Sequence, residues 1–164
     1  MNQANTLVNR TKSGIKSSTT EKFEPLVVCI ACNWCTYTGS DQAGRSRMQR
    51  PANVRIIRVM CSGRVEVEYA IEALKQGADG VIIGACHLGD CHYLEGNFKA
   101  VRRFGVVPRL LEQFGIHPDR IQLWHISASE GAEFTERIKE YVVHLRKLGP
   151  SPLKPKLKNE ETLS

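Results

Sequence analysis

No hydrophobic run in this 164-residue sequence approaches the about 20 residues that a membrane-spanning helix needs. The longest apolar runs are short and lie around Val27–Cys32 and Val81–Cys86. No apolar segment follows Met1, so the sequence also predicts that there is no secretory signal. We therefore expect a cytoplasmic protein without a membrane span.

Aromatic residues are scarce, at 7% of the sequence. The formal net charge is +6, but the excess of basic residues lies mainly at the two ends of the chain. A nucleic-acid-binding surface needs a basic stripe with aromatic platforms on the folded body. The sequence therefore predicts that nucleic acid is not a partner.

Nucleotide-binding and catalytic motifs are missing as well. No Gly-x-Gly-x-x-Gly follows the first apolar run, and there is no phosphate loop of the Walker type. The sequence also contains no convincing set of nucleophile, base and orienting acid. Nothing in it favours a catalytic subunit that transforms a substrate by itself.

The composition is that of a globular domain, with 41% hydrophobic and 24% charged residues. Residues 1–24 are rich in Ser, Thr, Asn and Lys, which predicts a flexible N-terminal extension. Residues 149–164 carry three prolines and alternating lysines, which predicts a flexible C-terminal tail. The folded domain is expected between them, over residues 25–148.

Short, nearly continuous apolar runs predict strands of a parallel sheet that is covered on both faces. Four such runs occur, at Leu26–Ala31, Val54–Val59, Gly80–Ala85 and Ile121–Ile126. Helical patterns lie between and after them, at Asp41–Gln49, Val67–Leu74, Leu94–Val101, Pro108–Phe114 and Phe134–Leu145. Gly77 is expected as the C-cap of the second helix, and a capping box of Ser127 and Glu130 is expected before the last. This alternation predicts the α/β class: a small doubly wound, mostly parallel four-stranded sheet of the flavodoxin-like order.

Six cysteines in a reducing compartment favour metal or redox chemistry over disulfides. Five of them follow predicted strands: Cys32, Cys35, Cys61, Cys86 and Cys91. The loops after parallel strands meet at the carboxyl edge of the sheet, where such folds bind ligands. We therefore expect five thiols at one rim. Cys29 lies inside the first strand and is expected in the core.

Three chemistries could use such a rim. An iron–sulfur cluster needs about four thiolates with backbone N–H groups nearby, and glycines flank these cysteines. A structural zinc site would use four thiolates as well. Thiol–disulfide exchange could use Cys32 and Cys35, which form a CxxC motif, but it would leave the other three thiols unexplained.

The five histidines are expected to have supporting or structural roles. His87 and His92 each follow a cysteine, but their spacing is not that of a Rieske centre, so we favour supporting roles. His117 is interpreted as a turn residue, His125 as a core residue and His144 as an exposed helix residue.

A run of arginines without any acid lies between Gln42 and Val65. It contains Arg45, Arg47, Arg50, Arg55, Arg58 and Arg64. Such a run is commonly a solvated basic face, but it could also balance an anionic cluster or attract an acidic partner.

Four motifs, taken in order, resemble the hydrogenase iron–sulfur subunit family, which is the delta subunit of methyl-viologen-reducing hydrogenase. They are CNWCTYTGSDQAG, RIIRVMCSGRV, GADGVIIGACHLGDCHYLEGN and WHISASEG. The resemblance extends over about residues 25–148. The sequence departs from many relatives at Ala31, where they have the first of two adjacent cysteines.

The resemblance implies a [2Fe-2S] cluster that relays single electrons. The donor would be a hydrogenase or formate dehydrogenase module, and the acceptor a heterodisulfide reductase A-type flavoprotein. The cluster-binding positions carry over to Cys32, Cys35, Cys61, Cys86 and Cys91, which are five candidates for four places. We would omit Cys32 first, because it lies closest to the strand end. The remaining alternatives are a zinc-stabilised interaction module without redox activity and a CxxC thiol oxidoreductase.

Overall fold

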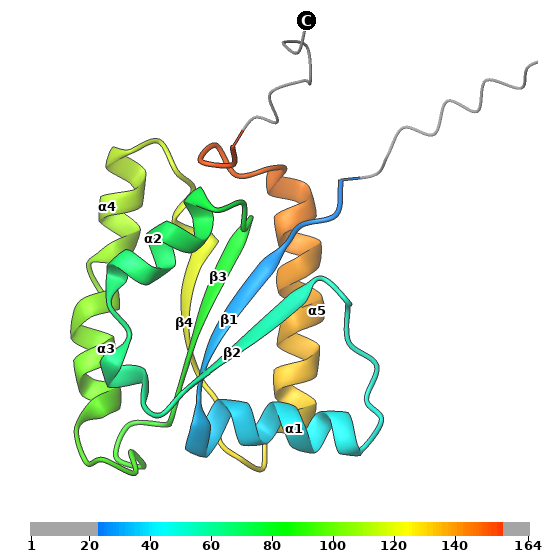
Figure 1. Ribbon diagram of the computed structural model, residues 1–164, viewed down its shortest axis with the longest axis vertical. Coiled ribbons are helices and arrows are strands. Elements are labelled where there is room, and N and C mark those ends of the chain that lie inside the picture. Colours follow the sequence, from blue (N-terminus) through cyan, green and yellow to red (C-terminus); the bar gives the residue numbers. More distant parts are fainter. Residues whose placement is uncertain (1–22, 156–164) are drawn as a thin grey trace, which may run out of the picture.

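The computed structural model describes residues 23–155, and four parallel strands form a single sheet within them (Figure 1). The strands are β1 (Val27–Cys32), β2 (Val54–Val59), β3 (Gly80–Ala85) and β4 (Ile121–His125). Their order is β2-β1-β3-β4, and Val27 of β1 lies opposite Val54 on one side and Gly80 on the other. These findings confirm the predicted α/β class and strand order.

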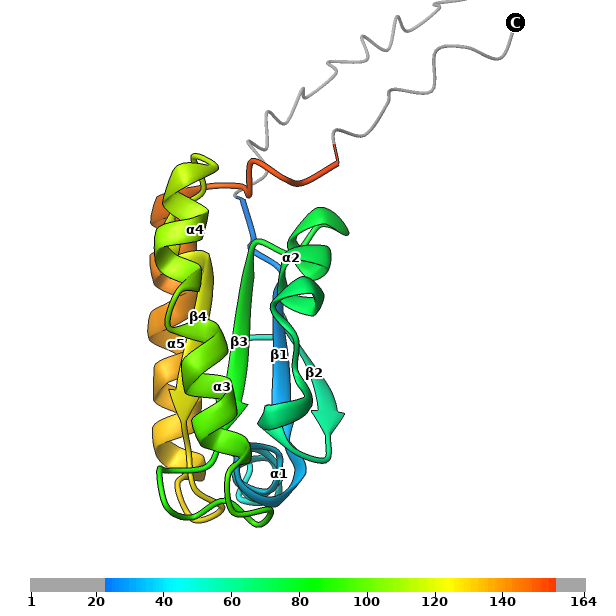
Figure 2. The same cartoon turned by 90° about the vertical axis from the view of Figure 1, so that its left-hand side faces the viewer.

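Helices cover both faces of the sheet (Figures 1 and 2). They are α1 (Thr38–Arg45), α2 (Val67–Lys75), α3 (Gly96–Phe104), α4 (Val107–Gln113) and α5 (Gly131–Leu148), with short turns η1 (Asn33–Tyr37), η2 (Ser62–Arg64) and η3 (Pro118–Arg120). One hydrophobic cluster joins α5 to the sheet, and a second joins α2, α3 and α4 to the other face. Alternate residues of β1 supply the two clusters, with Cys29 in the first and Ile30 in the second.

The apolar runs of the central strands are explained by burial, because these strands are covered on both faces. All six residues of β3 are buried. The expectation of coverage on both faces is wrong for β2, which lies at an edge of the sheet. Arg55 and Arg58 are exposed there, and 50% of Ile57 is accessible to solvent.

Local chain geometry shifts some of the predicted helix boundaries. The first crossover helix begins directly after the π-helical turn η1 and ends at Arg45, so it lies earlier than the predicted Asp41–Gln49. Leu94 does not belong to α3, since it has a φ of 68° and is 82% exposed. The C-cap of α2 is Gln76 rather than the predicted Gly77, which follows it with a φ of 109° that favours glycine.

Half of the predicted capping box forms at the start of α5. The Ser127 N–H donates to Glu130 Oε2 at 2.6 Å, whereas the Ser127 hydroxyl pairs with that of Ser129 at 3.0 Å. The helix itself begins at Gly131. The loop before α5 is therefore held by the glutamate.

The predicted N-terminal extension and C-terminal tail lie largely outside the described residues, namely in 1–22 and 156–164. Both ends of the described chain lie at the upper edge of the sheet in Figure 1, and the carboxyl ends of the strands lie at the lower edge, beside α1. Across residues 23–155, no helix combines the length and hydrophobicity that a bilayer crossing requires.

Candidate metal centre

The carboxyl edge of the sheet carries the five cysteines at the positions that follow the first three strands. Cys32 ends β1, and Cys35 lies in the turn η1 that follows it. Cys61 is the N-cap that precedes the turn η2 after β2, and Cys86 directly follows β3. Cys91 lies in the loop before α3. The structure therefore places all five at the predicted rim.

The five thiols form two groups. Cys32, Cys35 and Cys86 make up a thiol triad whose sulfur atoms all lie within 4.8 Å of one another. Cys61 and Cys91 make up a thiol pair with a sulfur–sulfur distance of 3.9 Å. The groups also interact with each other. The pKa of Cys35 is raised mainly by its hydrogen bond with Cys32 and slightly by Cys91, and the pKa of Cys61 is raised mainly by burial and slightly by Cys32.

The sulfur separations fit ligation by a metal. Bonds of about 2.3 Å at a tetrahedral ion place two thiolates about 3.8 Å apart. The Cys32–Cys86 distance is 3.7 Å, and the Cys61–Cys91 distance is 3.9 Å. All six cysteines are free thiols. The donor set thus suits iron in a sulfur cluster, and it also suits zinc.

Protons are shared unequally within the thiol triad. Hydrogen bonds from Cys35 and then Cys86 lower the pKa of Cys32, because they stabilise its thiolate. The same hydrogen bonds raise the pKa values of Cys35 and Cys86, which act as donors. Three adjacent thiolates repel one another, so a bound cation is needed to hold them all in the deprotonated form.

Backbone N–H groups point at the thiol pair. Burial raises the pKa of Cys61, although the Gly63 N–H donates to its sulfur at 3.4 Å. Burial acts in the same direction on Cys91, but the N–H groups of Tyr93 and Asn97 contribute to a net lowering of its pKa. Such N–H···S contacts stabilise thiolates and tune the potentials of iron–sulfur clusters.

Two glycines permit a close approach between the loops of the thiol pair. A Cβ atom on Gly96 would overlap the Cys61 sulfur and lie 3.1 Å from that of Cys91. A Cβ on Gly63 would lie 2.7 Å from the Gly96 Cα. The sequence indicated Gly63, which flanks a cysteine, but it gave no sign that Gly96 meets the same sulfur.

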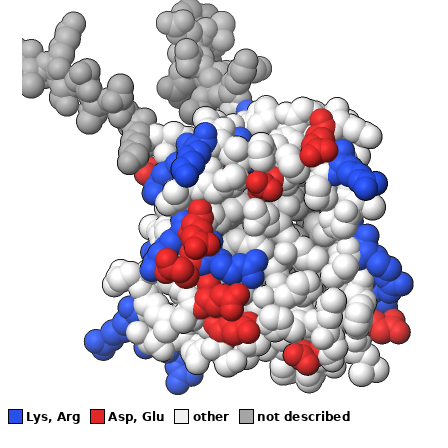
Figure 3. Space-filling view, turned by 180° about the vertical axis from the view of Figure 1, so that it is seen from behind, with Lys and Arg blue, Asp and Glu red and all other residues white. Residues whose placement is uncertain are grey.

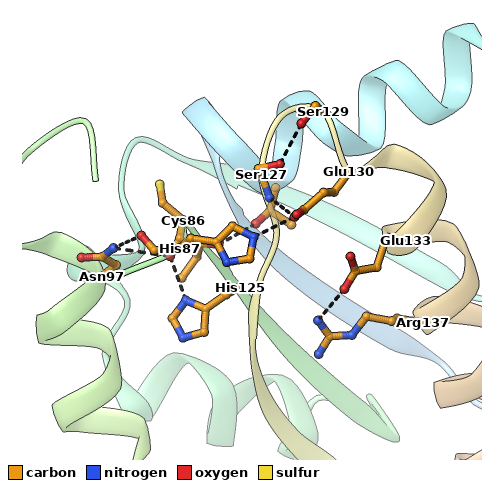
Figure 4. A network of polar contacts seen from close by, with 11 residues as sticks. Cys86, His87, Asn97, His125, Ser127, Ser129, Glu130, Glu133 and Arg137 are labelled. Atoms are coloured by element: carbon orange, nitrogen blue, oxygen red, sulfur yellow. Dashed lines mark hydrogen bonds and ion pairs between the residues drawn. The ribbon is translucent and has the colours of Figure 1, made fainter. Parts of the chain in front are cut away.

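Two further residues that the sequence analysis missed hold the cysteine loops. Asn97 is buried at the start of α3 and donates to the carbonyl groups of Cys86 and His87, at 3.4 and 2.5 Å (Figure 4). Arg103 of the same helix donates to the Gly63 carbonyl at 2.6 Å. The sequence gave no signal for either residue, because other polar residues of α3, such as Lys99 and Arg102, are exposed.

The histidines near the rim contact the loops that carry the cysteines. His125 Nδ1 donates to the Cys86 carbonyl at 2.8 Å, and His87 pairs with Glu130 at 2.8 Å (Figure 4). The pKa of Glu130 is lowered, first by the Ser127 N–H and then by His87. These contacts agree with the supporting role expected for His87. His125 was expected in the core, but it is only half-buried and its ring contacts the Cys86 loop instead.

An aromatic bridge joins the first and third cysteine loops. The Trp34 and His92 rings stack with centroids 3.8 Å apart and an interplanar angle of 18°. Trp34 also donates from Nε1 to the Tyr93 hydroxyl at 3.2 Å. Trp34 is nevertheless 40% exposed, so the bridge lies at the molecular surface beside the thiols.

A hollow of about 440 Å³ reaches Cys61 of the thiol pair. Its lining includes Cys61 and the basic side chains of Arg64 and Lys99. Other members of the arginine run lie further along α1, the following loop and β2, where Arg45 and Arg50 line a second hollow. The positive charge near Cys61 favours an anionic occupant.

Comparisons with known proteins agree on one family. The family described as "Methyl-viologen-reducing hydrogenase, delta subunit" matches residues 27–149. The iron-sulfur subunit of F420-non-reducing hydrogenase from Archaeoglobus profundus is 57% identical over 79% of this chain and 95% of its own length. The vhc iron-sulfur subunit of F420-non-reducing hydrogenase from Methanococcus voltae is 48% identical over 82% of this chain and 93% of its own length. The A-type subunit of Ferredoxin:CoB-CoM heterodisulfide reductase from Methanosarcina mazei is 42% identical over 90% of this chain, which matches 18% of that longer protein.

Proposed function

Because this chain belongs to the methyl-viologen-reducing hydrogenase delta subunit family, we propose that it is an electron-transfer subunit carrying one [2Fe-2S] cluster. The observation that carries the proposal is the convergence of five thiols from three loops at one rim. The cluster supplies one-electron redox chemistry. The protein binds it through thiolates and sets its potential through hydrogen bonds, charge and burial.

The thiol pair would supply two ligands, and two members of the thiol triad would supply the others. We assign these two places to Cys32 and Cys86, whose sulfur atoms lie 3.7 Å apart and are both buried, and leave the less buried Cys35 as the additional thiol. From the sequence, Cys32 was the first candidate to omit. The two assignments differ in which single substitution the cluster tolerates, so mutagenesis decides between them.

The proposed electron acceptor is a heterodisulfide reductase A-type flavoprotein, and the donor is a hydrogenase or formate dehydrogenase module. The related domain within the Methanosarcina heterodisulfide reductase supports the acceptor, because covalently joined domains are already positioned for transfer. The relatives that are iron-sulfur subunits of hydrogenases support the hydrogenase as donor.

Exposed apolar side chains on the cysteine loops provide a surface for such partners. We call this surface the rim patch, and it consists of Trp34, Met60, Leu88, Tyr93 and Leu94. Exposed apolar groups of this kind mark protein–protein contact sites. A partner docked on the rim patch would bring its own redox centre to the cysteine edge.

The test is chemical analysis of the full-length chain after purification without oxygen. We expect two irons and two acid-labile sulfides per chain, and an electron paramagnetic resonance signal after one-electron reduction. Cys61→Ser and Cys91→Ser should each lose most of the cluster. Among the triad, only Cys35→Ser should retain the full iron content.

Cys29→Ala is the matched control, since Cys29 is buried in the core away from the rim thiols. It should keep the complete cluster. Zinc without sulfide would contradict the proposal and indicate a structural module. A metal-free chain with a reversible Cys32–Cys35 disulfide would instead indicate a thiol oxidoreductase.

A further inference from the structure

Three side chains of the kinds that bind metals meet at the amino edge of the sheet, opposite the cysteine rim. His117 and Asp119 flank the start of η3, which leads into β4, and His144 lies in the last two turns of α5. One ligand atom from each residue lies within 4.8 Å of the others. The Asp119 carboxylate is at the centre, with Oδ2 2.9 Å from His144 Nε2 and 3.8 Å from His117 Nδ1.

These separations suit a transition-metal ion. Bonds of about 2.0–2.1 Å at a tetrahedral ion place nitrogen and oxygen ligands about 3.3 Å apart, between the two observed distances. His117 Nδ1 accepts a long hydrogen bond of 3.3 Å from the Asp119 N–H, and a metal ion bound at Nδ1 would replace this bond. Two imidazoles and one carboxylate form a donor set that binds zinc and other first-row divalent ions.

The surroundings hold these ligands in place. Tyr141, one turn before His144 on α5, donates from its hydroxyl to the Asp119 carbonyl at 2.9 Å. The partial negative charge at the carboxyl end of α5 also favours a cation near His144. Supports of this kind raise metal affinity because the ligands need less reorganisation.

Adjacent charge does not block the site. Asp119 and His144 line a hollow of about 350 Å³, which Glu140 lines as well. The guanidinium of Arg137, also in this hollow, lies 3.7 Å from Glu133 and 4.6 Å from the centre of the Trp124 ring. Figure 3 shows this α5 side of the molecule, where basic and acidic side chains adjoin one another.

We propose that His117, Asp119 and His144 form a binding site for one divalent transition-metal ion, with zinc as the best match. The three side chains are half-exposed, so the ion would exchange with solvent and keep a position open for water. It would fasten the loop before β4 to α5. The proposal is independent of the iron–sulfur assignment, because it uses none of the cysteines.

The test is a zinc titration of the full-length chain as purified without oxygen, followed by nuclear magnetic resonance of ¹⁵N-labelled histidine side chains. We expect the His117 and His144 signals to shift and to saturate at one zinc per chain, while the signals of the rim histidines stay in place. His144→Gln and Asp119→Asn should each weaken zinc binding by about tenfold or more.

Glu136→Gln is the matched control, since Glu136 is exposed on the same helix and pairs with Lys139 at 3.0 Å. It should bind zinc like the unaltered chain. The proposal is overturned if His117 and His144 do not shift, or if shifts occur only at the rim histidines. It is also overturned if the two ligand variants bind zinc as tightly as the control.

Discussion

Gly96 determines how closely α3 approaches the thiol pair. Its Cα occupies a place where any side chain would meet the sulfur atoms of Cys61 and Cys91. Since Gly63 packs against the same glycine, the η2 loop cannot simply move away from an added methyl group. The geometry of the thiol pair therefore depends on glycine at position 96 as well as on the two cysteines.

We expect Gly96→Ala to lose at least about half of its iron and sulfide, because the added Cβ forces one thiol of the pair out of position. The measurement is iron and sulfide per chain on anaerobically purified protein. Gly44→Ala is the control, since a Cβ there meets nothing within 4 Å and alanine favours a helix. A complete cluster with an unchanged spectrum in Gly96→Ala would refute this role.

The arginine run is distributed over α1, the loop after it, β2 and the turn η2. Arg45 ends α1, Arg47 lies in the loop, and the exposed arginines Arg55 and Arg58 lie on the edge strand β2. Arg58 also lies over the Tyr37 ring at 5.3 Å, so part of the run packs against the turn η1. An exposed edge strand and a helix end near the rim can together attract an acidic partner without contacting the cluster.

Charge reversal of Arg45 and Arg47 to glutamate should slow electron transfer to the flavoprotein several-fold at low ionic strength. The difference should shrink as salt rises, because the screening length falls from about 10 Å at 0.1 M to about 3 Å at 1 M. Stopped-flow mixing measures this rate. Arg109→Glu, on the exposed side of α4, is the control and should leave it unchanged. Equal rates for all variants at every salt concentration would argue against steering by these arginines.

The two ends of the described chain are joined to the sheet by one buried carboxylate. Asp79 is fully buried and accepts hydrogen bonds from the N–H groups of Leu26 and Ser151, both at 2.9 Å. Arg120 donates to the Asp79 carbonyl at 2.8 Å and to the Gly149 carbonyl at 2.9 Å. The molecule therefore has a structural edge at which its ends are fastened and an opposite edge with the thiols.

Asp79→Asn should lower the free energy of unfolding by about 2–4 kcal/mol, because an amide cannot accept all these hydrogen bonds. The cluster content of the folded protein should stay unchanged, since the substitution lies at the far edge. Chemical denaturation together with iron analysis measures both quantities. Asp41→Asn, on exposed α1, should change stability by less than about 1 kcal/mol. Loss of the cluster in folded Asp79→Asn would show that the two edges are not independent.

Much of this architecture follows from the sequence, because strand formation leaves a local pattern. The apolar runs of β1 and β3 reflect burial on both faces, and parallel strands bring the loops after them to a common edge. The gathering of five thiols could therefore be predicted. The exposure of β2 was missed because its apolar residues were given more weight than Arg55 and Arg58, which are charges typical of an edge strand.

Only the tertiary structure decided how side chains from distant positions meet. The division of the thiols into a triad and a pair depends on loop conformations, and the roles of Gly96, Asn97 and Arg103 depend on how α3 packs against the η2 loop. The sequence indicates a turn residue at His117 and an exposed helix residue at His144. In the folded chain, α5 places the His144 ring beside the His117 ring. Hydrophobic periodicity records which face of an element is buried, whereas contacts between elements depend on packing over the whole chain.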